Sequence, residues 1–289
     1  MKQTNNNLIN GTTVRHSFTH TISTRVFAML AMMVLLVFAG EMGWAATYYS
    51  QGSVTPSMLA NWNTVRAGGG SSPANFTAGD IFVIQSPHTM TTTAAWSISG
   101  TGSKLWIENG GTLVAASGFA VTVASATTFQ IDGGGTYKHQ NTNAYGTTIL
   151  QGTESFAATS NFEINNSNTT GPSGISSPGF GNLTINFTAD PTGNVNCAGA
   201  FTAIQGNLTI QNTDVRQFIL TGATALTLTI GGDLIISGGT LDFSNGGTNN
   251  RTYITTVPLR KHSIKKIRLY MKIRSFLKWG FQIDFKIVA

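Results

Sequence analysis

Short runs of apolar residues alternate with Gly-rich turns along most of the chain. The clearest copy is 232–243, in which an apolar strand is followed by Ser-Gly-Gly and then by Thr-Leu. Residues 104–114 and 128–137 follow the same plan, and 181–186 and 206–212 carry its first half. Alternation with a period of two is typical of a half-buried β-strand. No helical stripe interrupts this pattern between residues 47 and 250.

The spacing of these copies selects among all-β folds. Leu105 lies 24 residues before Phe129, Leu183 lies 25 before Leu208, and Leu208 lies 26 before Leu234. The interval from Phe129 to Phe162 is longer, at 33, and that from Phe162 to Leu183 is shorter, at 21. A repeat of this length without helices favours stacked coils in which each rung contacts only its neighbours. We therefore expect an all-β fold, a right-handed parallel β-helix (β-solenoid), with the Leu and Ile of each Leu-x-Ile facing inward. A β-sandwich is the alternative.

Composition supports a folded, exported all-β chain. Only 10% of the 289 residues are charged while 41% are hydrophobic, which is unlike disorder. Cys197 is the only cysteine, so no intramolecular disulfide forms, and we expect a buried, inert thiol. Charge divides the chain: four cations face nine acids between 47 and 250, whereas ten cations face one acid from 251 onward.

The N-terminal region has the order of a secretory signal peptide. Arg15 and Arg25 precede an uninterrupted apolar run at 26–40, and small residues follow up to Ala45 and Ala46. The run is shorter than the ~20 residues of a membrane span. We expect cleavage near Ala45/Ala46 and a secreted or outer-cell-surface protein, with an uncleaved anchor as the alternative.

Four segments follow from these patterns: a signal peptide at 1–46, a capping β segment at 47–100, solenoid repeats at 101–250 and a basic atypical tail at 251–289. The tail has a weak helical stripe between 264 and 277 and strand-like alternation from 281 to 287. We favour an interrupted or frame-shifted gene as its origin, over membrane contact through the basic residues or a genuine solenoid cap.

A family resemblance rests on motifs spread over residues 47 to 250. They are Tyr48-Tyr49-Ser50, Trp62, Gly79-Asp80 with the apolar residues to Ile84, His88-Thr89-Met90 and the rung from Leu105 to Leu113. In this order they resemble exported Gram-negative surface proteins, often cargo of type IX secretion, and the Gly-Asp segment is similar to the G8 domain. The resemblance implies an extracellular binding role, either adhesion or glycan contact. The sorting domain with which such proteins usually end is missing from the tail.

Candidate chemistry is sparse. Aromatic faces suit sugars, and the alternation around Trp106 predicts an outward-facing ring. Tyr137 is a second candidate platform, and Glu108 and Asp132 follow equivalent strands, so that they align along one edge. We take Trp106, Glu108, Asp132 and Tyr137 as candidate ligand-binding residues, with core packing and solvated turns as the alternatives.

The function that fits these features is a non-enzymatic, adhesin-like surface protein that contacts extracellular polysaccharide or other cell-surface components. A solenoid polysaccharide lyase or glycoside hydrolase is the alternative, which would need carboxylates converging in one groove. His88 and His139 are far apart with no nearby cysteine, so we expect no metal. We also expect no cofactor, no catalytic residues and no nucleic-acid partner.

Overall fold

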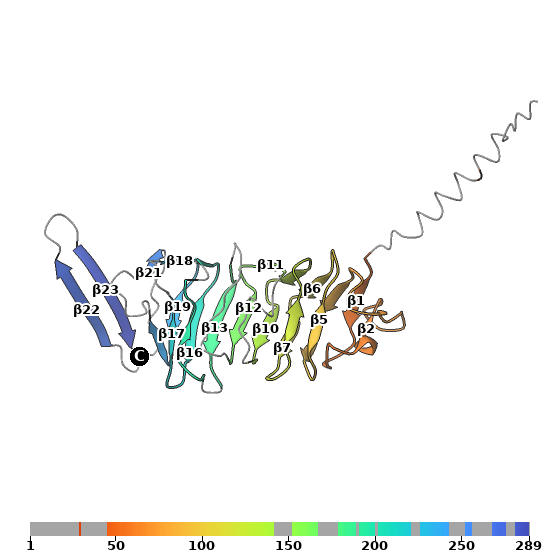
Figure 1. Cartoon of the computed structure of the whole chain (residues 1–289), viewed down its shortest axis with the longest axis horizontal. Coiled ribbons are helices and arrows are strands. Elements are labelled where there is room, and N and C mark those ends of the chain that lie inside the picture. The colour runs from red at the N-terminus through yellow and green to blue at the C-terminus, as the bar shows by residue number, and fades with distance from the viewer. Residues whose placement is uncertain are drawn as a thin grey trace, which may run out of the picture. The chain divides into compact units, whose positions relative to one another are not determined.

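The computed structural model describes an all-β protein built as a β-solenoid. It describes residues 29, 45–141, 152–166, 179–188, 191–199, 202–220 and 226–242, and the backbone of 252–255, 268–275 and 281–288. The chain divides into two compact units, Met1–Trp44 and Ala45–Ala289. Strands of the second unit stack rung upon rung, as Figure 1 shows. Most of the predicted signal peptide lies outside the described residues.

Two long sheets run along the solenoid. Sheet A contains, in spatial order, β11 (Thr153–Phe156), β9 (Thr128–Ile131), β6 (Lys104–Ile107), β3 (Ile81–Ile84), β1 (Thr47–Ser50) and β2 (Trp62–Asn63). Sheet B contains β19 (Leu234–Ile236), β16 (Leu208–Asn212), β13 (Asn182–Asn186), β12 (Asn161–Ile164), β10 (Thr136–His139), β7 (Thr112–Ala115) and β4 (Thr89–Thr91).

Three smaller sheets complete the coils. Sheet C pairs β5 (Trp96–Ile98) with β8 (Val121–Val123). Sheet D contains β14 (Val195–Asn196), β17 (Gln217–Ile219), β20 (Thr240–Asp242), β23 (Phe281–Val288) and β22 (Arg268–Ser275). Sheet E contains β15 (Ala203–Ile204), β18 (Leu226–Ile230) and β21 (Thr252–Thr255). A short 3-10 helix, η1, spans Leu59–Asn61.

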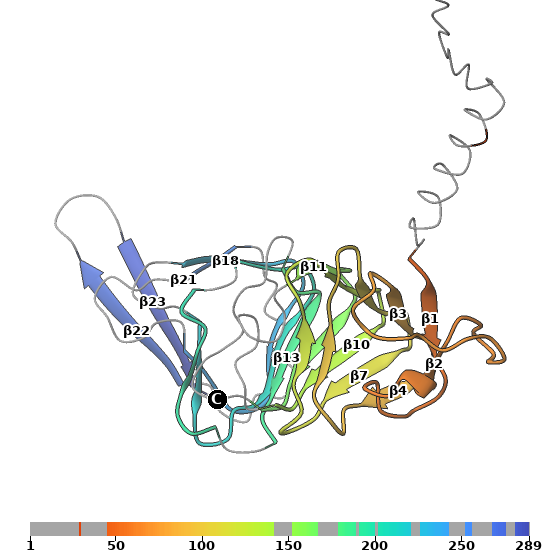
Figure 2. The same ribbon diagram turned by 45° about the vertical axis from the view of Figure 1, so that its right-hand side comes forward.

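Parallel pairing between rungs distinguishes the solenoid from the sandwich alternative. Every neighbouring pair in sheet B is parallel, and each strand follows its partner by one rung. Among the described strands, antiparallel pairing is confined to β1 with β2 and to the two pairs that β23 makes with β20 and β22. Figure 2 shows β13, β10, β7 and β4 following one another along one side.

The predicted inward ladders form the core. In sheet B one register row is buried throughout and consists of Met90, Leu113, Tyr137, Phe162, Leu183, Leu208 and Leu234. In sheet A the row of Ile84, Ile107, Ile131 and Phe156 is buried likewise. Burial of one such side chain stabilises by roughly 1.5–3 kcal/mol, so the repeats themselves supply the stability of the stack.

Polar residues at the corners connect consecutive rungs. The Asn182 Oδ1 accepts the Asn207 N–H at 2.9 Å, and the Asn207 Oδ1 accepts the Asp233 N–H at 2.7 Å. Each amide thus bonds to the backbone of the following coil, as in the Asn ladders of stacked β-structures. At another corner, Gly110 has a φ of 78°, and a Cβ on Gly111 would lie 2.4 Å from the Ile84 carbonyl oxygen.

Both ends of the second unit contain paired strands. The strands β3, β4 and β5 pair in parallel with β6, β7 and β8, so stacking between rungs extends into the 47–100 segment. The weak helical stripe between 264 and 277 does not correspond to a helix in its described part, because residues 268–275 form strand β22, paired with β23. The apolar residues of β22, Leu269, Met271 and Ile273, also alternate with a period of two. In the described part of the chain, no helix has the length and apolarity to cross a membrane.

Candidate functional site

Trp106 lies on the outer face of sheet A, as its alternation with Leu105 and Ile107 predicted. Leu105 and Ile107 are fully buried, whereas Trp106 is only partly buried. The Lys104 Nζ lies 5.4 Å from the centroid of the Trp106 ring, within the range of a cation–π contact. The same ammonium donates to the Gln130 Oε1 at 3.1 Å. A sugar stacking on this ring would compete with Lys104.

Glu108 is held by an arginine from a distant loop. The Arg66 Nη1 donates to the Glu108 Oε2 at 2.8 Å, and the Arg66 Nη2 donates to the other carboxylate oxygen. The Arg66 guanidinium carbon also lies 4.3 Å from the centroid of the Tyr49 ring. The hydrogen bond that Arg66 donates to Glu108 is the largest cause that raises the pKa of Arg66. Glu108 therefore anchors the loop, and its oxygens are already engaged.

Asp132 follows Glu108 by one rung, as the sequence predicted. Ile107 and Ile131 are register partners, so the residues after them occupy equivalent positions. The Asp132 N–H donates to the Ile107 carbonyl at 2.9 Å, and the Asp132 Oδ1 accepts from the Gln130 Nε2 at 2.8 Å. The two carboxylates therefore occupy one edge, but each already has a hydrogen-bond partner.

Tyr137 does not belong to this surface. Its ring is 0% exposed and packs inside the coil, with the Phe129 and Phe162 rings at 5.5 and 4.8 Å between centroids. Its hydroxyl lies 3.2 Å from the His139 Nδ1. The sequence contained a sign of this buried position, because Gly-Gly-Thr-Tyr aligns with Gly-Gly-Thr-Leu and Tyr137 is the register partner of Leu113. Its role as a sugar platform is thus corrected to a core role, since no ligand outside reaches the ring.

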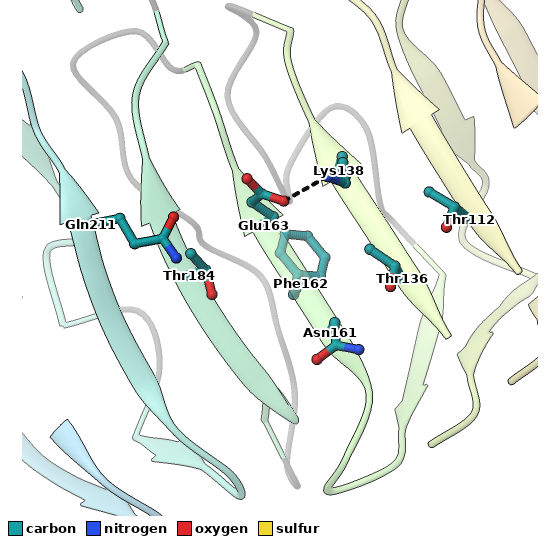
Figure 3. A pocket seen from close by; sticks show the side chains of 8 residues that line it. All are labelled: Thr112, Thr136, Lys138, Asn161, Phe162, Glu163, Thr184 and Gln211. Atoms are coloured by element: carbon teal, nitrogen blue, oxygen red, sulfur yellow. Dashed lines mark ion pairs between the residues drawn. The ribbon is translucent and has the colours of Figure 1, made fainter. Parts of the chain in front are cut away.

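An open depression lies on the outer face of sheet B and crosses five consecutive strands. Figure 3 shows its lining residues, which point outward from neighbouring strands apart from Phe162, a core residue. They are Thr112, Thr136, Lys138, Asn161, Phe162, Glu163, Thr184 and Gln211. At its centre the Lys138 Nζ lies 3.0 Å from the Glu163 Oε2. No motif in the sequence points to these residues as a site.

Glu163 is fixed as a carboxylate by its neighbours. The Glu163 Oε1 accepts from the Asn165 Nδ2 at 2.8 Å and from the Asn186 Nδ2 at 3.3 Å. Partial burial alone would raise the pKa of Glu163, but the hydrogen bonds from Asn165, Lys138 and Asn186 outweigh it and lower the pKa. The positive charge of Lys138 and the negative charge of Glu163 therefore offset each other on this part of the face.

Several polar groups around this ion pair have no internal partner. Within the described part of the chain, the side chains of Thr112, Thr136, Thr184 and Gln211 make no hydrogen bond. Lys138 uses one of its three donors in the ion pair with Glu163. Because neighbouring strands lie about 4.8 Å apart, these groups repeat at that interval along the solenoid axis. The depression can therefore donate to and accept from a ligand that runs across the strands.

A serine and a histidine meet at the N-terminal end of the solenoid. The Ser50 Oγ lies 2.8 Å from the His88 Nδ1, which is a distance typical of a nucleophile and its base. Ser50 is 0% exposed, however, and the His88 Nδ1 also accepts the Gly52 N–H at 3.2 Å. The pair thus connects the end of β1, at Ser50, to the residue that precedes β4. Among the described residues, no cluster of three or more His, Cys, Asp or Glu is arranged to hold a metal ion.

Comparisons with family models, with curated proteins and with solved structures found no significant match to this chain. The similarity to exported surface proteins therefore rests on the short motifs of the sequence, and the fold rests on the register of the strands.

Proposed function

We propose that this chain is a non-enzymatic secreted or cell-surface protein that binds a glycan or a similar polyhydroxyl polymer, in the manner of an adhesin. The observation that carries the proposal is the outer face of sheet B, where Thr136, Thr184 and Gln211 surround the Lys138–Glu163 ion pair and their side chains make no hydrogen bond to the described residues. An exported chain of the kind that the motifs resemble, including type IX cargo and G8-like proteins, meets such polymers outside the cell.

Chemistry selects the ligand class. Hydroxyl, amide, ammonium and carboxylate groups all pair with sugar hydroxyls, and a site built to hydrogen-bond hydroxyls discriminates strongly against analogues that lack them. Lys138 and Glu163 offset each other's charge, which favours a neutral polymer over an anionic one. The depression has no exposed aromatic ring among its lining residues, so binding there depends on hydrogen bonds.

The outer face of sheet A is the weaker candidate. Glu108 is paired with Arg66, and Gln130 bridges Lys104 and Asp132. A ligand would have to replace these contacts before it could use the Trp106 ring, and each replaced hydrogen bond lowers the net gain from binding.

A glycan-array screen of the purified chain tests the proposal, with release of reducing sugar measured in parallel. Thr136→Val and Thr184→Val together remove two hydroxyls from the depression with little change in shape. We expect about thirtyfold weaker binding, because each of the two lost hydrogen bonds contributes about 1 kcal/mol. The matched control is Thr122→Val on sheet C, which should bind normally. Binding lost equally in both variants would contradict the assignment to sheet B, and steady release of reducing sugar would favour the enzyme.

A further inference from the structure

The first strand of the solenoid begins where the predicted signal peptide ends. The second compact unit starts at Ala45, and β1 starts at Thr47. Ala46 already belongs to the fold through both of its backbone groups. Its N–H donates to the Asp80 Oδ1 at 2.9 Å, and its carbonyl accepts the Ile81 N–H at 2.8 Å.

We infer that the signal peptide is removed between Ala45 and Ala46, and that Asp80 binds the α-ammonium group which this cleavage creates at Ala46. The inference rests on the export that the proposed function includes. It assigns a processing site to one peptide bond and a role to the Gly79-Asp80 motif.

The residues before the bond fit this cut better than the alternatives. Signal peptidases require small residues at the first and third positions before the cleavage site, as in Ala-x-Ala. Cleavage after Ala45 places Ala45 and Gly43 there. Cleavage after Ala46 would place Trp44 at the third position, and cleavage after Gly43 would place Glu41 there.

The fold distinguishes the same sites independently. Loss of Ala46 would remove the carbonyl that accepts the Ile81 N–H, and with it one bond of the ladder between β1 and β3. Ala45 is exposed, whereas Ala46 is partly buried. The cut between them therefore leaves every described contact of β1 in place.

Cleavage changes the strength of the Asp80 contact. Before it, a neutral amide donates to the carboxylate; after it, an ammonium group donates from the same atom. A charge-assisted hydrogen bond is roughly twice as strong as a neutral one. Asp80 is partly buried. Its carbonyl accepts the Lys104 N–H at 3.0 Å, which connects Asp80 to the start of β6. The new N-terminus is thereby tied to β3 and β6.

The first test is the intact mass of the full chain after export from a Gram-negative host. The expected N-terminus is Ala46, and any other N-terminus overturns the processing site. The second test compares the effect of Asp80→Asn in two purified chains, one that starts at Ala46 and one with a short extension before it. Asp132→Asn is the control, because it also removes a partly buried carboxylate at an outer corner.

We expect Asp80→Asn to lower the folding equilibrium constant of the Ala46 chain about fivefold more than that of the extended chain. The excess should vanish above about pH 10, where an α-amino group has lost its proton. Asp132→Asn should affect both chains equally. An equal effect of Asp80→Asn in the two chains would overturn the role of Asp80. Neither readout involves a glycan, so failure of glycan binding leaves this inference untouched.

Discussion

Arg66 and Glu108 are 42 residues apart in the sequence, yet they form a bidentate ion pair on the outer face of sheet A. The pair joins the loop after β2 to the end of β6. The Arg66 carbonyl also accepts from the Gln85 Nε2 at 2.9 Å, so side chain and backbone of one residue both fasten the loop. The N-terminal coil is thus covered by a segment that the repeat pattern does not contain.

Glu108→Gln should destabilise the N-terminal coil only slightly. The Arg66 side chain is 50% exposed and that of Glu108 is 18% exposed, so solvent screens the pair and about 1 kcal/mol or less is expected. Urea denaturation at low and high salt measures it, and the difference from wild type should shrink as salt rises. A double-mutant cycle with Arg66→Met provides the control. Additive effects of the two substitutions would contradict coupling between them.

Acid should weaken the sheet-B face through Glu163. Because the pKa of this carboxyl in the folded protein lies below its ordinary value of 4.5, its contribution is complete above that pH and is lost as pH falls through the folded pKa. Stability measured from pH 6 to about pH 3 should therefore decline less steeply in Glu163→Gln than in wild type. Identical slopes would show that the hydrogen bonds from Asn165 and Asn186 do not favour the charged form.

The Asn ladder should contribute measurably to the stacking of the coils. Asn207→Ala removes the side-chain oxygen that accepts the Asp233 N–H, and a loss of about 1 kcal/mol in the free energy of unfolding is expected. Thr209→Ala, two residues further on in β16, is the control, because Thr209 alternates with the buried Leu208 and Ile210 and is only partly buried. Equal losses in the two variants would argue that the ladder bond has no net value.

Repetition made the fold predictable, because Leu105 pairs with Phe129, and Leu208 with Leu183 and Leu234, as their spacing implies. The long interval from Phe129 to Phe162 arises because Phe129 lies in sheet A and Phe162 in sheet B. Glu108 and Asp132 were placed correctly along one edge because of the same repetition. Contacts outside the repeat were not predictable. Nothing in the sequence links Arg66 with Glu108, and the Lys138–Glu163 pair forms only because β10 and β12 become neighbours.

Two expectations failed for different physical reasons. Tyr137 was treated as a surface aromatic because of its residue type, although its position in the repeat is that of Leu113. In the tail, Ile264, Ile267 and Met271 have helical spacing, but Leu269, Met271 and Ile273 alternate like a strand, and residues 268–275 pair with β23. The position of a residue within the repeat therefore predicts its burial better than its residue type does. Where apolar spacing fits both a helix and a strand, the available pairing partner decides which one forms.

The core role of Tyr137 predicts a clear pair of phenotypes. Tyr137→Ala should cost about 3–5 kcal/mol of stability, as truncation of a buried aromatic ring usually does. Tyr137→Phe keeps the ring and should retain most of the stability and all of the glycan binding. Thermal unfolding and the glycan array measure the two effects. A folded Tyr137→Phe protein that binds glycan poorly would return Tyr137 to the binding site.

The central claim is that the outer face of sheet B binds a neutral polyhydroxyl polymer. Calorimetric titration of a neutral polysaccharide selected from the array, into wild type and into the Lys138→Met, Glu163→Gln double variant, tests it most directly. The double variant removes both charges together and leaves neither unpaired. We expect wild type to bind the polymer and a folded double variant to bind it at least about tenfold more weakly. Equal affinities of the two proteins for the polymer would contradict it.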